Sequence, residues 1–314
     1  MCTAISYTTG AHYFGRNLDL ERSYGERVVI TPQRFPLPMR LAEPLNHHYA
    51  MIGMATVAEG YPLYYEATNE KGLSMAGLNF PDNAVYKPPM SGRDNISPFE
   101  FIPWILGRCA TVAEARQALE RVNLAQVPFS ENLPLSPLHW LLADRKHAVV
   151  VESVAQGLRV YDNPVRVLTN NPPFPYHLTN LCNYMSLHEG AADNRLGGDL
   201  TPYSLGMGAL GLPGDYSSAS RFVRAVFVRQ KSRCEGDETA SVNQFFHILT
   251  AVAMPKGCVL AANGDHEYTR YSCCCNTDSG TYYYTTYDNP TPRRVDMRGV
   301  DVDGAVLWQS ALIE

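Results

Sequence analysis

The chain has 314 residues, of which 45% are hydrophobic, and a formal net charge of -5 at pH 7. Its charges are scattered rather than gathered into a basic stripe, which argues against nucleic acid as a partner. No segment approaches the ~18 apolar residues that cross a membrane, and residues 1–4 lack the features of an export signal. We expect a cytoplasmic protein without membrane insertion, folded as a single domain over residues 1–314.

The first third of the chain predicts a β-meander, because short apolar runs alternate with Gly, Pro and Asn turns. The expected strands are 4–7, 13–17, 27–31, 49–54 and 73–80. Two helices should follow, one over 98–106 and one that begins at a capping box over 111–114. The expected apolar face of the second helix consists of Ala115, Ala118, Leu119 and Val122.

The rest of the chain predicts further strands and a second pair of helices. The strands are expected at 138–142, 148–154, 158–161, 165–168, 267–275 and 281–287. The helices are expected at about 219–229 and 241–253. Blocks of strands that alternate with pairs of helices favour stacked sheets with helices outside over regular βαβ units.

Cys2 carries the most informative chemistry near the start of the chain. A small penultimate residue permits cleavage of Met1, and one residue then holds both a thiol and a free α-amine. An α-amine has a pKa near ~7.7–8.0, against ~10.4 for lysine, so part of it can accept the thiol proton at neutral pH. Taken alone, Cys2 is more commonly an ordinary small residue near a terminus.

Arg16 and Asp19 lie three residues apart at the end of the second expected strand. Both can face a hairpin partner that begins at Cys2. Arg16 would favour the thiolate, and Asp19 would orient or ionise the amine. The alternative is a surface ion pair at a turn, worth ~0–1 kcal/mol.

Two asparagines, Asn79 and Asn170, follow predicted strands. Acyl transfer needs donors for a developing oxyanion, and removing a side-chain amide of this kind typically costs ~3–4 kcal/mol. The alternative is turn formation, which Asn-Pro sequences such as Asn171-Pro172 commonly serve.

The sequence favours neither a metal nor a cofactor. The cysteine triplet 273–275 lacks the paired spacing of zinc ligands, and a strand accounts for it better. Residues 206–211 match the G-x-G-x-x-G pattern, but Pro202 before it and Pro213 after it disfavour the strand and helix of a dinucleotide site. The histidines form no H-E-x-x-H or Ser–His–Asp signature.

Six motifs together resemble the choloylglycine hydrolase family, which contains the bile salt hydrolases and the penicillin V acylases. They are MCTA at 1–4, YFGRNLD at 13–19, NEKGL at 69–73, GLNFP at 77–81, LTNNP at 168–172 and GLPGD at 211–215. The resemblance extends over residues 1 to about 290 in the family's order.

This resemblance implies an α+β fold, the four-layer αββα sandwich of the N-terminal nucleophile (Ntn) hydrolases, and a homotetramer with no metal or cofactor. It makes Cys2 the nucleophile and places Arg16 and Asp19 beside the thiol and the amine. The reaction that it implies is hydrolysis of the C24 amide of glycine- and taurine-conjugated bile acids through a Cys2 thioester.

The resemblance also assigns the oxyanion hole. Asn170 is similar to the family residue whose side chain helps to form it, and Asn79 matches the position that gives a main-chain donor. Arg221 matches the family's last catalytic-site arginine. Penicillin V acylases typically carry tyrosine at the position of Asn79, so the asparagine favours bile salts.

An apolar pocket would suit a steroid, since burial of hydrocarbon yields ~25 cal/mol per Å². The segment 128–134 resembles the family's pocket loop. The expected lining is Leu18, Tyr24, Ala58, Tyr65, Phe129 and Leu133.

Three other functions stay open at this stage. The nearest is a penicillin V or N-acyl-homoserine lactone acylase that uses the same residues. A steroid- or lipid-binding protein without catalysis on this scaffold is the second. A thiol redox role is disfavoured, since the chain has no C-x-x-C motif.

Overall fold

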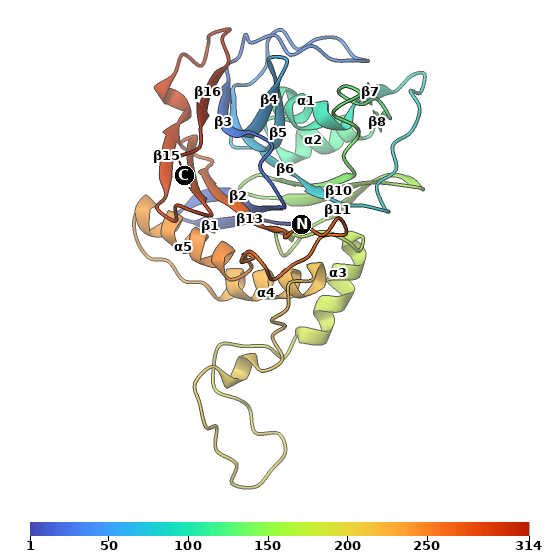
Figure 1. Cartoon of the computed structure of the whole chain (residues 1–314). Helices are drawn as coiled ribbons and strands as arrows, with labels where there is room; N and C mark the ends of the chain where they lie inside the picture. Colours follow the sequence, from blue (N-terminus) through green and yellow to red (C-terminus); the bar gives the residue numbers. More distant parts are fainter. Residues whose placement is uncertain (314) are drawn as a thin grey trace.

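Two large antiparallel sheets stack face to face at the centre of the molecule (Figure 1). The computed structural model describes residues 1–313. The first sheet has six strands in the order β12-β1-β2-β13-β14-β15. Its strands are β1 (Cys2–Thr9), β2 (Ala11–Leu20), β12 (Val167–Leu168), β13 (Tyr268–Asn276), β14 (Thr281–Thr286) and β15 (Arg293–Asp296).

The second sheet has eight strands in the order β11-β10-β9-β6-β5-β4-β3-β16. They are β3 (Glu26–Thr31), β4 (Met51–Ala58), β5 (Tyr61–Asn69), β6 (Ser74–Asn79), β9 (Leu138–Ala143), β10 (Ala148–Val154), β11 (Gly157–Asp162) and β16 (Trp308–Ala311). A separate parallel pair is formed by β7 (Asp94–Ile96) and β8 (Val122–Leu124).

Helices cover the outer face of each sheet. Helices α1 (Phe101–Arg108) and α2 (Val112–Leu119) pack on the second sheet, and α4 (Ser218–Lys231) and α5 (Glu238–Thr250) pack on the first, with α3 (Phe174–Leu181) beside α4 (Figure 1). The predicted α+β sandwich of four layers is therefore confirmed.

The central strands of the second sheet are buried on both of their faces. Val28 and Ile30 of β3 belong to the core shared with the first sheet, whereas Val29 between them packs in the core beneath α1 and α2. Successive side chains of a strand point to opposite faces, so a strand buried on both faces is apolar throughout. This explains why the core strands appear in the sequence as continuous apolar runs.

Three local predictions need correction. The expected meander is divided between the layers, because β1 and β2 belong to the first sheet and β3 to β6 to the second. Strand β5 was not predicted, and neither were β7, β8, β15, β16 and α3. Val122 lies in β8 rather than on α2, and β12 is only Val167–Leu168. Periodicity reports whether a segment is a strand, but the partner sheet is decided by contacts distant in sequence.

The cysteine triplet 273–275 lies in β13, and all three thiols are buried, as the strand prediction required. Among residues 1–313, no helix is both long enough and apolar enough to cross a membrane.

Residues 185–217 leave the body of the molecule as a long arm between α3 and α4 (Figure 1). The arm contains one short 3-10 helix, η3 (Met207–Ala209), at the G-x-G-x-x-G match. Its exposed apolar side chains include Met185, Leu196, Leu200, Tyr203, Leu205 and Leu210.

Candidate active site

Cys2 is the first residue of β1 and pairs with Leu18 of β2. It is only 3% exposed. Its backbone nitrogen donates to Asn170 Oδ1 at 2.8 Å, and its carbonyl accepts from Arg221 Nη1 at 2.5 Å. Because Met1 precedes Cys2 in the sequence, this nitrogen is a peptide nitrogen, and removal of Met1 would turn it into an α-amine.

Met1 extends β1 by one residue. Its carbonyl accepts from Asp19 N–H at 3.0 Å, and its ammonium donates to the Asp19 carbonyl at 2.9 Å and pairs with Glu267. Burial lowers the pKa of this ammonium, and the nearby Arg221 and Arg16 lower it further, while Cys2 and Asp19 oppose the shift. The surroundings of Cys2 therefore hold a buried amino group, that of Met1.

Arg16 of β2 is fully buried between the two sheets. Its Nη1 donates to the carbonyls of Gly77 at 2.5 Å and Tyr65 at 3.1 Å, and its Nε lies 3.8 Å from Glu66 Oε2. Burial acts to lower the pKa of Arg16, but Cys2, Tyr271 and Glu66 outweigh it and raise that pKa. Nη2 has no hydrogen-bond partner in the described chain.

Glu66 of β5 is the buried carboxylate that faces Arg16. Both of its oxygens accept hydrogen bonds, Oε2 from the Tyr271 hydroxyl and Oε1 from the Tyr282 hydroxyl, each at 2.7 Å. Burial raises the pKa of Glu66, and Arg16 with the two hydroxyls opposes that shift. These contacts connect β5 of the second sheet to β13 and β14 of the first, so they fix the gap in which Arg16 lies.

Asp19 lies on the opposite face of β2 from Arg16, because the two positions differ by an odd number of residues. Its Oδ1 accepts from Thr269 Oγ1 at 2.6 Å, and that hydroxyl accepts from Met254 N–H after α5. The carboxylate is buried, and Oδ2 has no partner within residues 1–313. Arg16 and Asp19 thus lie on opposite faces of β2. They approach the Cys2 end of β1 from opposite faces.

Asn170 follows β12 and connects the groups around Cys2. Its Oδ1 accepts from Cys2 N–H and from Arg221 Nη2 at 2.7 Å, and its Nδ2 donates to the Asn79 carbonyl at 2.7 Å. His177 Nε2 lies 2.9 Å from the Asn170 carbonyl. An amide nitrogen carries two donors, so the second N–H of Nδ2 can serve a substrate oxygen. Asn79 itself is exposed at the end of β6.

Arg221 lies in the first turn of α4 and is fully buried. Besides Cys2 and Asn170, its guanidinium donates to Thr3 Oγ1 at 2.7 Å and to the Tyr216 carbonyl at 3.0 Å. All four acceptors are neutral oxygens. Burial lowers the pKa of Arg221, and the charges of Asp19 and Cys2 only partly oppose this.

The family model for linear amide C-N hydrolases, choloylglycine hydrolase family, matches residues 2–308. The chain belongs to this family. It is 52% identical, over 98% of its length and 95% of the relative, to a bile salt hydrolase/transferase of Lactiplantibacillus plantarum. It is 41% identical, over 92% of the chain and 93% of the relative, to a conjugated bile acid hydrolase of Lactobacillus acidophilus.

Solved structures agree with this choloylglycine hydrolase membership. A conjugated bile acid hydrolase from Clostridium perfringens superposes with a TM-score of 0.93 at 34% identity, covering 100% of this chain and 97% of that one. Penicillin V acylase from Agrobacterium tumefaciens superposes with a TM-score of 0.77 at 19% identity, covering 98% of this chain and 90% of that one. This likeness shows the shared Ntn hydrolase fold alone. The predicted family and fold type are confirmed.

The residues predicted to line a substrate pocket divide into two groups. Leu18 and Tyr65 adjoin Cys2 and Arg16, since Leu18 pairs with Cys2 and the Tyr65 carbonyl accepts from Arg16. Tyr24 joins this group through Thr56, whose hydroxyl donates to the Tyr24 carbonyl and contacts the Tyr65 hydroxyl. The second group, which packs in the core beneath α1 and α2, is Ala58, Phe129 and Leu133.

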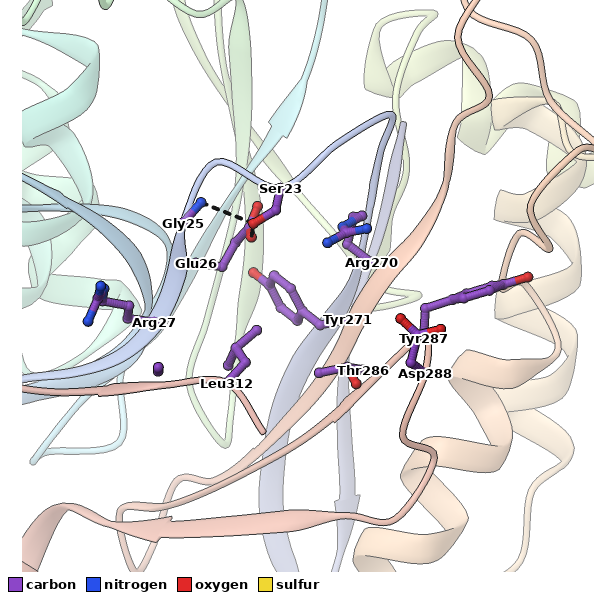
Figure 2. Close-up of a pocket in the computed structure, with 11 residues that line it drawn as sticks. Ser23, Gly25, Glu26, Arg27, Arg270, Tyr271, Thr286, Tyr287, Asp288 and Leu312 are labelled. Atoms are coloured by element: carbon purple, nitrogen blue, oxygen red, sulfur yellow. Dashed lines mark hydrogen bonds between the residues drawn. The ribbon is translucent and has the colours of Figure 1, made fainter. Parts of the chain in front are cut away.

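A cavity of about 210 Å³ opens between the sheets beside Tyr271. Figure 2 shows the Tyr271 ring reaching from β13 toward Glu26, with the loop of Ser23 and Gly25 on the far side. Tyr24, between these two loop residues, is 41% exposed and is absent from the cavity lining. This cavity therefore adjoins the Glu66 network rather than the predicted steroid pocket.

Sequence reasoning missed two acidic residues, Glu66 and Glu267. Glu66 left a usable signal, because a carboxylate among the aromatic and small residues of 61–69 indicates a buried ion pair. Glu267 left no comparable signal, since it directly precedes β13 in a polar stretch. Its contact with Met1 exists only in the folded chain.

Proposed function

We propose that this chain is a bile salt hydrolase, which cleaves the C24 amide of glycine- and taurine-conjugated bile acids. The observation that carries the proposal is the setting of Cys2, at the first position of a buried strand with its nitrogen on Asn170. The names of the relatives at 52% and 41% identity support the substrate class.

In the proposed acylation step, Met1 has been removed and the Cys2 α-amine takes the thiol proton. The thiolate, stabilised by the nearby Arg16, attacks the amide carbon. The free N–H of Asn170 Nδ2 and the Asn79 main chain hold the oxyanion. The C–N bond then breaks as the protonated amine gives its proton to the leaving nitrogen, and a bile-acyl thioester remains on Cys2.

In the proposed deacylation step, the same amine takes a proton from water, and the resulting hydroxide attacks the thioester carbon. The C–S bond breaks, the sulfur leaves as thiolate and regains its proton, and free bile acid departs. Arg221 and Asp19 position the amine and the amide of Asn170 throughout, since Arg221 holds Asn170 Oδ1 and the Cys2 carbonyl.

The proposed pocket places the steroid over Leu18, Tyr24, Ala58, Tyr65, Phe129 and Leu133. Support comes from Tyr24 and Tyr65, which meet at Thr56 within reach of the strand that holds Arg16. The apolar rings favour a rigid hydrocarbon, and the amide end meets the polar groups around Cys2.

The proposed assembly is a homotetramer in the cytoplasm. The arm over residues 185–217 exposes Leu196 at 91% and Leu205 at 97%, an unusual exposure for leucine unless another surface covers it. The eight cysteines are all free thiols, which suits a reducing compartment. Sedimentation of the full chain, compared with a variant carrying Leu196→Ser and Leu205→Ser, tests the assembly.

The direct test of the activity is release of glycine and taurine from glycocholate and taurocholate, with penicillin V in parallel. The protein is first confirmed by mass to begin at Cys2. Rapid release from both bile salts with little cleavage of penicillin V is expected, given the asparagine at position 79. Preference for penicillin V would overturn the assignment.

Replacing the nucleophile is the strongest single perturbation of this chemistry. Cys2→Ala should abolish turnover with the fold unchanged, and Cys2→Ser should leave at most a trace, because the hydroxyl is a far weaker nucleophile near neutral pH. Steady-state kinetics and circular dichroism check this. Full activity in either variant is incompatible with the mechanism.

Blocking the amine is a separate test. An extension that keeps Met1 in place leaves Cys2 nitrogen as an amide, which cannot accept a proton. Such protein should be folded and inactive, and cleavage of the extension by a protease that leaves Cys2 first should restore turnover. Activity before cleavage contradicts the role of the amine.

A further inference from the structure

Cleavage of Met1 leaves three polar groups beside Cys2 without their partners. Met1 and Asp19 exchange both of their backbone hydrogen bonds, at 2.9 and 3.0 Å. Once Met1 is gone, the Asp19 carbonyl and N–H lose these bonds. The Glu267 carboxylate, which pairs with the Met1 ammonium, loses its cation at the same time.

The space that Met1 vacates lies where the proposed hydrolysis releases an amine. Adjacent backbone nitrogens in an extended chain are roughly 3–4 Å apart, so the Met1 nitrogen marks a point next to the Cys2 nitrogen. A nitrogen that takes a proton from the Cys2 amine as its C–N bond breaks must come to such a point. The Met1 ammonium therefore stands in for the leaving amino group.

We propose that the space vacated by Met1 is the subsite for the leaving amine, with the Glu267 carboxylate and the Asp19 carbonyl as its hydrogen-bond acceptors. This inference rests on the amide hydrolysis proposed above. As the C–N bond breaks, its electron pair passes to nitrogen, which takes the proton of the Cys2 ammonium. The free amine then takes a second proton from water and leaves as an ammonium ion.

The charges around this point explain why a carboxylate is needed there. Burial is the main cause that disfavours charge on the terminal ammonium, and Arg221 and Arg16 add to it, while Cys2 and Asp19 oppose the shift. Positive charge that develops on a leaving nitrogen meets the same two guanidinium groups. The side chain of Glu267, 14% exposed in contact with the Met1 ammonium, supplies the opposite charge where that nitrogen emerges.

The test compares an amide and an ester that share one acyl group. Glycocholate releases an amine, whereas the p-nitrophenyl ester of cholic acid releases an oxygen leaving group that carries no positive charge. The variants are Glu267→Gln, Glu267→Asp and the control Glu189→Gln, whose carboxylate pairs with Lys231 on the surface. Each protein is confirmed by mass to begin at Cys2, since Glu267 also contacts Met1.

For Glu267→Gln, kcat/KM on glycocholate should fall by ~10–100-fold, with the ester changed by less than ~2-fold. Glu267→Asp should recover part of the loss, and Glu189→Gln should match the native chain on both substrates. Unchanged amide hydrolysis in Glu267→Gln overturns the inference. Equal losses on amide and ester overturn it too, because they place the effect on the nucleophile or the fold. A native chain inactive on glycocholate instead refutes the proposed function.

Discussion

Two buried arginines approach Cys2 from different sides, and their surroundings differ in charge. Arg16, between the sheets, faces the carboxylate of Glu66. Arg221, on the helix side, donates only to neutral oxygens, among them the Cys2 carbonyl and Asn170 Oδ1. Burial acts to lower the pKa of both arginines, but Cys2, Tyr271 and Glu66 outweigh it and raise the pKa of Arg16, whereas the pKa of Arg221 stays lowered.

The difference indicates how charge is divided in the site. On the inter-sheet side, the charge of Arg16 is compensated by the carboxylate of Glu66, and two tyrosine hydroxyls fix that carboxylate by hydrogen bonds. On the helix side, a guanidinium whose hydrogen-bond acceptors are all neutral polarises the amide of Asn170, which turns its Nδ2 away from the guanidinium and toward Asn79. One arginine thus lies beside a carboxylate, and the other lies among neutral acceptors that it orients.

Breaking the balance on the inter-sheet side should have the largest effect on stability. Arg16→Met leaves Glu66 as an uncompensated buried charge, so the free energy of unfolding should fall by ~3–5 kcal/mol. Adding Glu66→Gln should restore a large part of it, although activity stays lost in both variants. Urea unfolding of the single and double variants measures this. A double variant less stable than Arg16→Met contradicts the pairing.

The second largest effect on stability should come from low pH, through one buried histidine on each side of the first sheet. Burial lowers the pKa of His177, which contacts the Asn170 carbonyl, to about 4, and that of His12, at the far end of β2, to about 4. Both are neutral in the fold, whereas the unfolded histidine protonates near ~6.5. The unfolded chain therefore binds more protons between these values. Stability present above pH 6.5 is lost as pH falls toward 4, by up to about 3 kcal/mol for each histidine.

Unfolding midpoints between pH 7.5 and 4.5 measure this slope. Both His177→Asn and His12→Asn should flatten it by similar amounts. Only His177→Asn should also lower kcat, because His12 contacts Ser6 and Thr277 far from Cys2. A slope that neither variant changes would show that other groups dominate the acid response.

Loss of the helix-side arginine should cost the least stability. Arg221→Met leaves neutral oxygens without a donor, at ~1–3 kcal/mol in the free energy of unfolding, which is less than for Arg16→Met. Turnover should nevertheless fall by ~10²–10³-fold, because Asn170 loses the contact that orients its amide. Steady-state kinetics at a temperature where the variant is fully folded separates the two effects. A kcat close to that of the native chain argues against this role.

The strands around the candidate site were largely predictable. The alternation of apolar runs and turns located β1, β2, β6 and β13 near their observed bounds. The capping box at Thr111 located the start of α2. Strand β5 was missed because its Tyr64-Tyr65-Glu66 interrupts the apolar pattern, and with it the partner of Arg16 was missed. Strand alternation also explains why Arg16 and Asp19, three positions apart, lie on opposite faces of β2.

The catalytic roles of Cys2, Arg16, Asp19, Asn79, Asn170 and Arg221 stay predictions. What the structure adds is that the groups converge, from β1, β2, β6, the turn after β12 and α4, through hydrogen bonds that include Asn170 to Asn79 and Arg221 to Cys2. Such contacts join residues up to 219 positions apart, and no local pattern encodes them.

The sequence by itself determined the family, the candidate nucleophile Cys2 and most secondary structure, because motif order, residue chemistry and hydrophobic periodicity are all local properties. Tertiary structure alone decided which strands share a sheet, which oxygens surround each arginine, and that Glu267 lies beside the terminal amine. These depend on how two sheets and their helices pack, and packing brings together charges whose separation along the chain carries no signal.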